Sequence, residues 1–204
     1  MMLPLRGCLI LVAMTLTCAP LFGQVIEYEN NGHKYQTLTR KGLTVIVTHL
    51  PTKVQNFGLI QVSVANGSQI YWSVKPEDFS YVRQEVGYSA LSAKAVVDLL
   101  LDRGSGSDVI HLVTTYENAL YGIPNMRSTN GYEARRRGSL SAGMPVRLKA
   151  AAAASALALT LTRLSPGQST DGAVFIPLTH ELKALAGGKI IVNCGGEIFE
   201  FNPE

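Results

Sequence analysis

The sequence predicts a mainly β protein with an α-helical insertion (α+β), in which an antiparallel β-sandwich is interrupted by three helices. Apolar and polar residues alternate in short segments of 24–83 and again of 164–204, whereas in 84–163 the apolar residues recur at helical spacing. The 204 residues suffice for one sizeable domain, or for one domain with a large insertion. We therefore expect 24–83 and 164–204 to form one discontinuous sandwich domain, with 84–163 as its helical insertion.

The clearest strand pattern lies in residues 59–82. Apolar residues alternate with polar ones on both sides of Asn66-Gly67, a dipeptide that tolerates the positive φ angles of a tight hairpin turn. We expect a hairpin here, with Trp72 anchoring its buried face because aromatic side chains bury the most area. Pro76 should end the second strand, since proline has no N–H to donate.

Further short strands surround this hairpin in the sequence. Turn residues and β-branched runs predict them at 25–29, 35–40, 43–50, 79–83, 172–178, 189–194 and 197–201. Gly195-Gly196 separates the last two and predicts a C-terminal hairpin. Many short strands with closely spaced turns favour an antiparallel sandwich or barrel.

Two of the three expected helices have recognisable ends. Ser89 can cap the first, which should end at Gly104, and Asp108 can cap the second, which should end at Gly122. The stretch 104–107 between them is rich in glycine and serine and predicts a flexible link.

The third expected helix covers residues 147–164 and is rich in alanine. Lys149 and Arg163 bracket 13 uncharged residues, fewer than the roughly 20 needed to cross a bilayer. We expect this helix to pack closely against the sheet, and we expect no transmembrane helix in the mature chain.

Residues 1–23 have the pattern of a signal peptide. A positive charge precedes the uncharged apolar run 8–18, which is too short to span a bilayer, and Gly23 is a suitable small residue before a cleavage site. The mature chain would then be exported, to the periplasm or out of the cell. A lipid anchor is the less favoured alternative because Thr17-Cys18 fits an acylation signal poorly, and a buried N-terminal helix is another.

After such a cleavage, Cys194 would be the one remaining thiol. Cys194 comes at the end of the strand-like run that begins with the apolar residues 190–192. This position favours a buried thiol that acts as a small hydrophobic residue. The alternative is a cross-link between two chains.

Four runs suggest a family: VSVANGS, KPEDF, LSPGQSTDGAVFIPL and KIIVNCGGEIFEF. With these runs the chain resembles the exported immunoglobulin-like (telokin-like) β-sandwich domains of uncharacterised bacterial envelope proteins. The resemblance covers residues 25–83 and 164–202. It implies a binding or structural module and transfers no active-site residue, and the antibody-type Cys…Trp…Cys pattern is missing around Trp72.

Motifs for catalysis and for metals do not match. None of the four histidines stands in an HExxH pattern, and there is no Cys-x-x-Cys. The loop 138–143 has the wrong spacing for a nucleophile elbow, and Gly187-Gly188-Lys189 lacks the rest of a P-loop. We expect no cofactor and no metal. A hydrolase with a non-standard site, and an envelope subunit that self-assembles through edge strands or Cys194, are the alternative functions.

Positive charge is concentrated in the expected insertion. The formal net charge is +3, while residues 127–149 carry six basic residues and one acid, or +5, which leaves −2 for the rest. The basic residues are Arg127, Arg135, Arg136, Arg137, Arg147 and Lys149.

Arginine forms bidentate bonds to phosphate and carboxylate, so this basic cluster is a candidate contact for an anionic partner. The expected partners are an envelope protein, a cell-wall polymer or an anionic lipid surface; the overall charge is too mild to imply nucleic acid. The alternative is a solvated surface whose arginines pair with Asp98, Asp102 and Glu117. The sequence thus predicts an exported, non-enzymatic binding or structural module.

Overall fold

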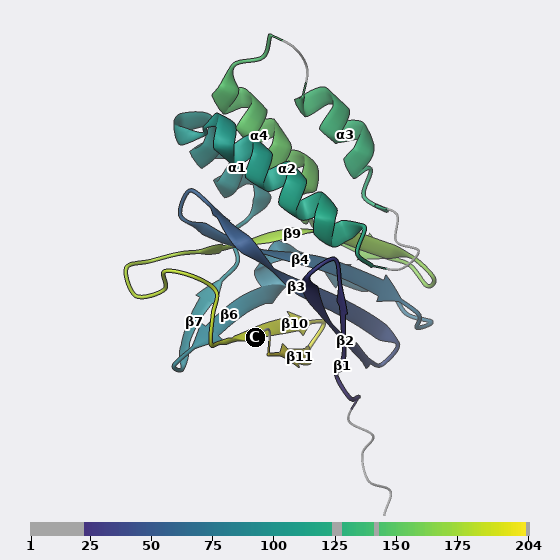
Figure 1. Ribbon diagram of the computed structural model, residues 1–204. Helices are drawn as coiled ribbons and strands as arrows, with labels where there is room; N and C mark the ends of the chain where they lie inside the picture. The colour runs from purple at the N-terminus through teal and green to yellow at the C-terminus, as the bar shows by residue number, and fades with distance from the viewer. Residues whose placement is uncertain (1–22, 124–127, 141–142, 203–204) are drawn as a thin grey trace, which may run out of the picture.

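The computed structural model describes residues 23–123, 128–140 and 143–202. In these residues the chain forms antiparallel β-sheets with helices, which confirms the α+β class. The helices cover one face of a five-stranded sheet, and a four-stranded sheet lies on its other side (Figure 1). The expected signal peptide, apart from Gly23, lies outside the described residues.

The larger sheet has the strand order β1-β2-β3-β4-β9, with every neighbouring pair antiparallel. Its strands are β1 (Ile26–Asn30), β2 (His33–Arg40), β3 (Leu43–Val54), β4 (Phe57–Asn66) and β9 (Ser169–Pro177). The first four follow one another through tight turns, in which Asn31, Lys41 and Gln55 have positive φ. The pairing of β3 with β4 shifts register between Leu50 and Lys53, which is a bulge in β3.

The smaller sheet has the order β11-β10-β6-β7. Its strands are β6 (Phe79–Arg83), β7 (Val86–Ser89), β10 (Lys189–Cys194) and β11 (Glu197–Phe201). The predicted hairpin at Gly195-Gly196 is confirmed, with Cys194 paired to Glu197. Because β9 pairs with β4 and β10 pairs with β6, strands from the two ends of the sequence share both sheets.

A hydrophobic core fills the space between the two sheets. Alternation along β3 and β4 turns Val45, Val47 and Val62 towards this core, where they meet Phe79 and Phe199 of the smaller sheet. Trp72 lies in the same core and is 5% exposed. The predicted anchoring role of Trp72 is therefore confirmed, although the strand that carries it does not pair with the strand expected.

The expected hairpin at Asn66-Gly67 is wrong. Strand β4 pairs with β3 and β9, whereas the short strand β5 (Trp72–Val74) pairs with β8 (Thr162–Leu164) and is followed by the 3₁₀ turn η1 (Pro76–Asp78). The Asn66 amide donates to the carbonyls of Ile70 and Leu164, at 2.7 and 3.1 Å, and its oxygen accepts from Ser68. Because of these bonds the chain leaves the sheet after β4, and the longer strand β9 pairs with the second edge of β4.

A second core lies between the larger sheet and the helices. It joins Leu50, Leu59 and Phe175 of the sheet to the helices. The helices are α1 (Ala93–Arg103), α2 (Gly106–Leu120), α3 (Tyr132–Ser139) and α4 (Val146–Leu157). The alanine-rich α4, which was expected to pack against the sheet, packs mainly against α1, α2 and α3, because its small side chains permit close approach. Helix α2 lies against β3 and β4.

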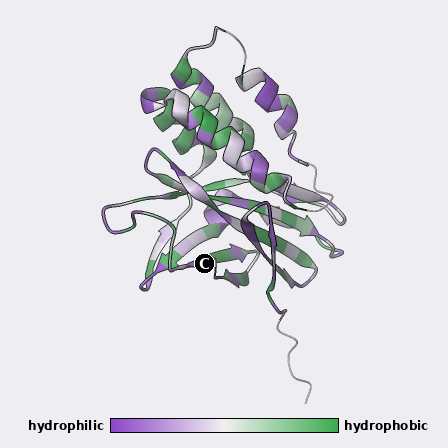
Figure 2. Cartoon of the chain, viewed as in Figure 1, coloured by the Kyte–Doolittle hydropathy of each residue, from purple (hydrophilic) through white to green (hydrophobic). Residues whose placement is uncertain are grey.

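The described residues contain four helices, where the sequence predicted three. The additional helix, α3, is short and mostly hydrophilic (Figure 2), so it lacks the apolar periodicity that would reveal it. Its one large buried side chain is Tyr132.

Several helix ends also differ from expectation. Residues 86–89 form β7, so α1 begins after Ser92, whose hydroxyl accepts from the backbone of Ala95. Ser105 caps α2, and Asp108 completes a capping box from the third helical position. The predicted link 104–107 is therefore partly helical, and α4 ends at Leu157 because the chain after it pairs with the sheets.

Among the described residues, no helix combines the length and the apolar character needed to cross a membrane.

Candidate binding cleft

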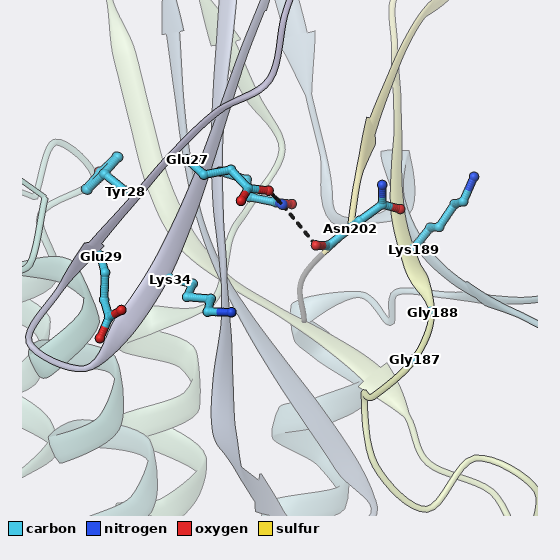
Figure 3. Close-up of a pocket in the computed structure, with 9 residues that line it drawn as sticks. Glu27, Tyr28, Glu29, Lys34, Gly187, Gly188, Lys189 and Asn202 are labelled. Carbon is cyan, nitrogen blue, oxygen red and sulfur yellow. Dashed lines mark hydrogen bonds between the residues drawn. The ribbon is translucent and has the colours of Figure 1, made fainter.

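A cleft of about 690 Å³ opens where the edges of the two sheets approach each other. Strands β1 and β2 form one wall, and the chain leading into β10 forms the other (Figure 3). The lining residues are Glu27, Tyr28, Glu29, Lys34, Gln36, Gly187, Gly188, Lys189 and Asn202. We call this feature the binding cleft.

Gln36 forms the floor of the binding cleft and is 5% exposed. Its side-chain nitrogen donates to the Asn202 carbonyl at 2.9 Å and to the Glu27 carboxylate, which fixes the orientation of the amide. Its oxygen Oε1 is buried and, among the described residues, has no hydrogen-bond partner. A buried acceptor without a donor is costly. Oε1 has no surface open to the cleft, so a ligand reaches it only if the Gln36 side chain shifts.

The walls of the binding cleft carry charges of both signs. Glu27 and Glu29 alternate with Tyr28 along β1 and therefore lie on one face of the strand. Lys34 is exposed and has no ion pair among the described residues. Lys189 does form one, with its Nζ 3.6 Å from Oε2 of Glu200. A lining of this kind suits a polar ligand that has both donors and acceptors.

Two features hold the walls in place. The Tyr28 ring stacks on the Tyr35 ring, with centroids 4.9 Å apart, and the Tyr35 hydroxyl donates to the Ala119 carbonyl at 2.7 Å. Opposite, a Cβ at Gly188 would lie 2.6 Å from the Val82 carbonyl oxygen, so glycine lets the chain pass this close to β6. Burial raises the pKa of Tyr28, so its hydroxyl, which is protonated at neutral pH in any case, stays protonated further into alkaline solution.

The structure separates the members of the predicted basic cluster, and Arg127 lies outside the described residues. Arg135 donates to the Ala156 carbonyl at 3.2 and 2.8 Å, which places a cation at the C-terminal end of α4. Arg136 forms an ion pair with Glu117 on α2. Both arginines therefore connect the helices.

The other members of the cluster have different surroundings. Arg137 is exposed on α3, where its Nε donates to the Glu133 carbonyl at 3.4 Å. Arg147 is exposed and Lys149 is half-buried. Of the acids considered as alternative partners of the arginines, Glu117 does pair with one, whereas Asp98 pairs with Lys94.

A buried carboxylate that the sequence analysis did not single out joins the helices to the sheet. Asp171 of β9 is 1% exposed. It accepts hydrogen bonds from the Tyr116 hydroxyl at 2.8 Å, the Thr129 backbone N–H at 2.7 Å, the Thr129 hydroxyl at 3.1 Å and the Ser128 hydroxyl at 3.1 Å. Both oxygens of the carboxylate accept hydrogen bonds, so we interpret Asp171 as a structural anchor. The signal that could have revealed it is a charged residue directly before the apolar part of β9.

The Asp171 anchor continues into the helices. The Tyr116 and Tyr132 rings meet edge to face, with centroids 5.0 Å apart, and the Tyr132 hydroxyl donates to Glu117 at 3.0 Å. Burial and the nearby Asp171 raise the pKa of Tyr116 well above its usual value. These contacts fix α3 to α2.

The four histidines are dispersed. His33 and His49 have pKa values lowered by burial, while His111 and His180 are exposed. Within the described ranges, no group of three potential metal ligands occurs.

Cys194 is a buried free thiol, as the apolar run before it predicted. Its Sγ donates to the Ser73 carbonyl at 3.2 Å. Burial raises the thiol pKa to about 11, with a smaller contribution from Asp78. A thiol in this state is a poor nucleophile and is shielded from other chains.

Comparisons of the chain with models of protein families, with curated proteins and with solved structures found no match. The resemblance to immunoglobulin-like (telokin-like) domains consequently stays a prediction.

Proposed function

We propose that the chain is an exported, non-enzymatic binding module of the cell envelope or the extracellular space, and that its ligand occupies the binding cleft. The observation that carries the proposal is the cleft of about 690 Å³, whose lining residues include two glutamates and two lysines. Charged groups of both signs at the rim suit a polar ligand. The pattern of residues 1–23 supports export.

We propose in addition that the two sheets form an immunoglobulin-like sandwich, with the helices as an insertion. The two sheets that share a core, and the pairing of early with late strands, support this assignment. The exposed Arg137 and Arg147, together with Lys149, stay candidate contacts for an anionic partner. Arg135 and Arg136 are less suitable because their guanidinium groups are already bound.

Capture from envelope extracts tests the binding function. The tagged mature protein is compared with Glu29→Lys, which inverts a charge in the cleft, and with Glu85→Lys, which makes the same change of charge in the exposed turn between β6 and β7. We expect the wild type and Glu85→Lys to retain the same component, identified by mass spectrometry, and Glu29→Lys to lose it. Equal recovery by all three proteins would exclude the cleft as the ligand site.

Export is tested separately with the full chain. Val12→Arg places a charge in the apolar run of the expected signal peptide. We expect the wild type outside the cytoplasm with Gln24 as its N-terminus, and Val12→Arg retained inside with the N-terminus intact. An uncleaved wild type in the cytoplasm would contradict the proposed location.

A further inference from the structure

A second concave surface lies beside the β3–β4 turn and is independent of the binding cleft. Two pockets of about 330 and 360 Å³ adjoin here and share Lys53, Leu178 and Lys183. His49 lines one of them and His180 the other. We call this surface the basic groove.

The geometry points to a binding site for a phosphate-type anion in the basic groove, with Lys53 and Lys183 as its two cationic contacts. Basic and neutral side chains line both pockets, and none of the lining residues is acidic. Lysine binds phosphate as a compact point charge, and two lysines that line the same pockets can contact one anion together.

The backbone that carries the two lysines is held firmly. Lys53 lies next to the bulge in β3, within the strand pairing to β4. Lys183 lies between Leu182 and Leu185, both buried in the core between the sheets. The Leu178 N–H donates to the Asn56 carbonyl at 2.7 Å, which ties the start of this segment to the β3–β4 turn.

Gly58 explains why the segment can lie so close to the sheet. A Cβ at this position would lie 2.6 Å from Cγ of Leu185. Without a side chain on β4 here, Leu185 packs directly against the strand, and Lys183 is brought to the same groove as Lys53.

The charges of the groove are not compensated by the chain itself. Neither Lys53 nor Lys183 has an ion pair within the described ranges. Asp108, which contacts the β3–β4 turn, is engaged by the Gln55 amide at 2.6 Å and by Ser105. Burial lowers the pKa of His49, so at neutral pH this imidazole can donate one hydrogen bond without adding charge.

The test uses the mature protein and two sources of the same chemistry. Isothermal titration with inorganic phosphate and with glycerol 3-phosphate measures binding of the free anion. Sedimentation with vesicles of phosphatidylcholine, with and without phosphatidylglycerol, measures binding of a lipid phosphate. The double variant Lys53→Ala, Lys183→Ala is compared with Lys75→Ala, Lys94→Ala, which removes the same charge from exposed lysines outside the groove.

We expect the wild type and the control variant to bind at least one of these probes, and the groove variant to bind it at least ten-fold more weakly. Binding of the soluble anions would identify a free phosphate compound, and binding of the anionic vesicles alone would identify a lipid headgroup. No binding of any probe by the wild type, or equal weakening in both variants, would overturn the inference. None of these outcomes bears on capture through the binding cleft, so the two proposals can fail separately.

Discussion

Replacing Asp171 by asparagine should destabilise the fold by about 3 kcal/mol. The carboxylate is 1% exposed and accepts from one backbone N–H and three hydroxyls, at 2.7 to 3.1 Å. An amide of the same shape keeps one acceptor oxygen but turns an NH₂ group towards donors. About two hydrogen bonds to a charged acceptor are lost, each contributing about 1.5–3 kcal/mol, and rotation of the hydroxyls recovers part of the loss.

Two further variants separate this effect from a general loss of charge. Tyr116→Phe removes one of the four donors and leaves the carboxylate with the others, so we expect a loss of about 1.5 kcal/mol. The double variant should lose less than the sum of the two single losses because both remove the same hydrogen bond. Asp98→Asn is the matched control, since Asp98 pairs with Lys94 on the exposed face of α1 and should contribute about 0.5 kcal/mol or less.

Urea unfolding, followed by far-ultraviolet circular dichroism and by fluorescence, measures these free energies. We expect Asp171→Asn to lower the midpoint while the m-value stays the same, which indicates a change in stability and not in the surface exposed. A midpoint for Asp171→Asn equal to that of Asp98→Asn would refute the anchor interpretation. Additive losses in the double variant would refute the direct bond between Tyr116 and Asp171.

Three other predictions concern groups whose environment the fold determines. Burial raises the pKa of Cys194 to about 11, so the thiol should react slowly with a disulfide reagent until urea unfolds the chain, and a rapid reaction in the native state would contradict its burial. Burial also raises the pKa of Tyr35 to about 12. Above pH 10 the unfolded chain loses a proton that the folded chain keeps, so the free energy of unfolding should fall as pH rises. An unchanged urea midpoint between pH 9 and pH 11 would oppose this expectation. At Gly172 a Cβ would lie 2.6 Å from backbone atoms of Leu159, so Gly172→Ala should cost about 3 kcal/mol in urea unfolding, whereas Gly106→Ala, with open space around the Cβ, should leave stability the same or slightly higher.

Local patterns in the sequence predicted most strands, because alternation and turn residues act over a few positions. The hairpin at Gly195-Gly196 was predicted correctly since its two strands are neighbours both in sequence and in space. The equally strong signal at Asn66-Gly67 was misleading because β4 finds its second partner in β9, about a hundred residues later. A turn signal gives the direction of the chain but does not reveal a competing long-range partner.

The charge pattern illustrates a second limit. The run of arginines in 135–137 predicts one basic surface, but a helix places successive side chains about 100° apart. Arg135 consequently reaches the end of α4, Arg136 reaches Glu117, and Arg137 is exposed. The binding cleft and the basic groove could not be predicted either, since each forms where an early hairpin meets the 178–189 segment.

The outer edge of β1 lies beside the binding cleft, and two glutamates on it can keep that edge free. β1 ends the strand order of its sheet, and such an edge can pair with another copy of the same chain. Antiparallel self-pairing centred on Tyr28 would set Glu27 opposite Glu29 of the second copy, and like charges in these positions oppose pairing. We therefore expect the wild type to be monomeric in light scattering and Glu27→Thr, Glu29→Thr to associate as concentration rises, whereas the control Glu85→Thr should not. Association of the wild type through β1, detected as protection of its amides from hydrogen exchange, would show that these glutamates do not keep the edge free for a ligand.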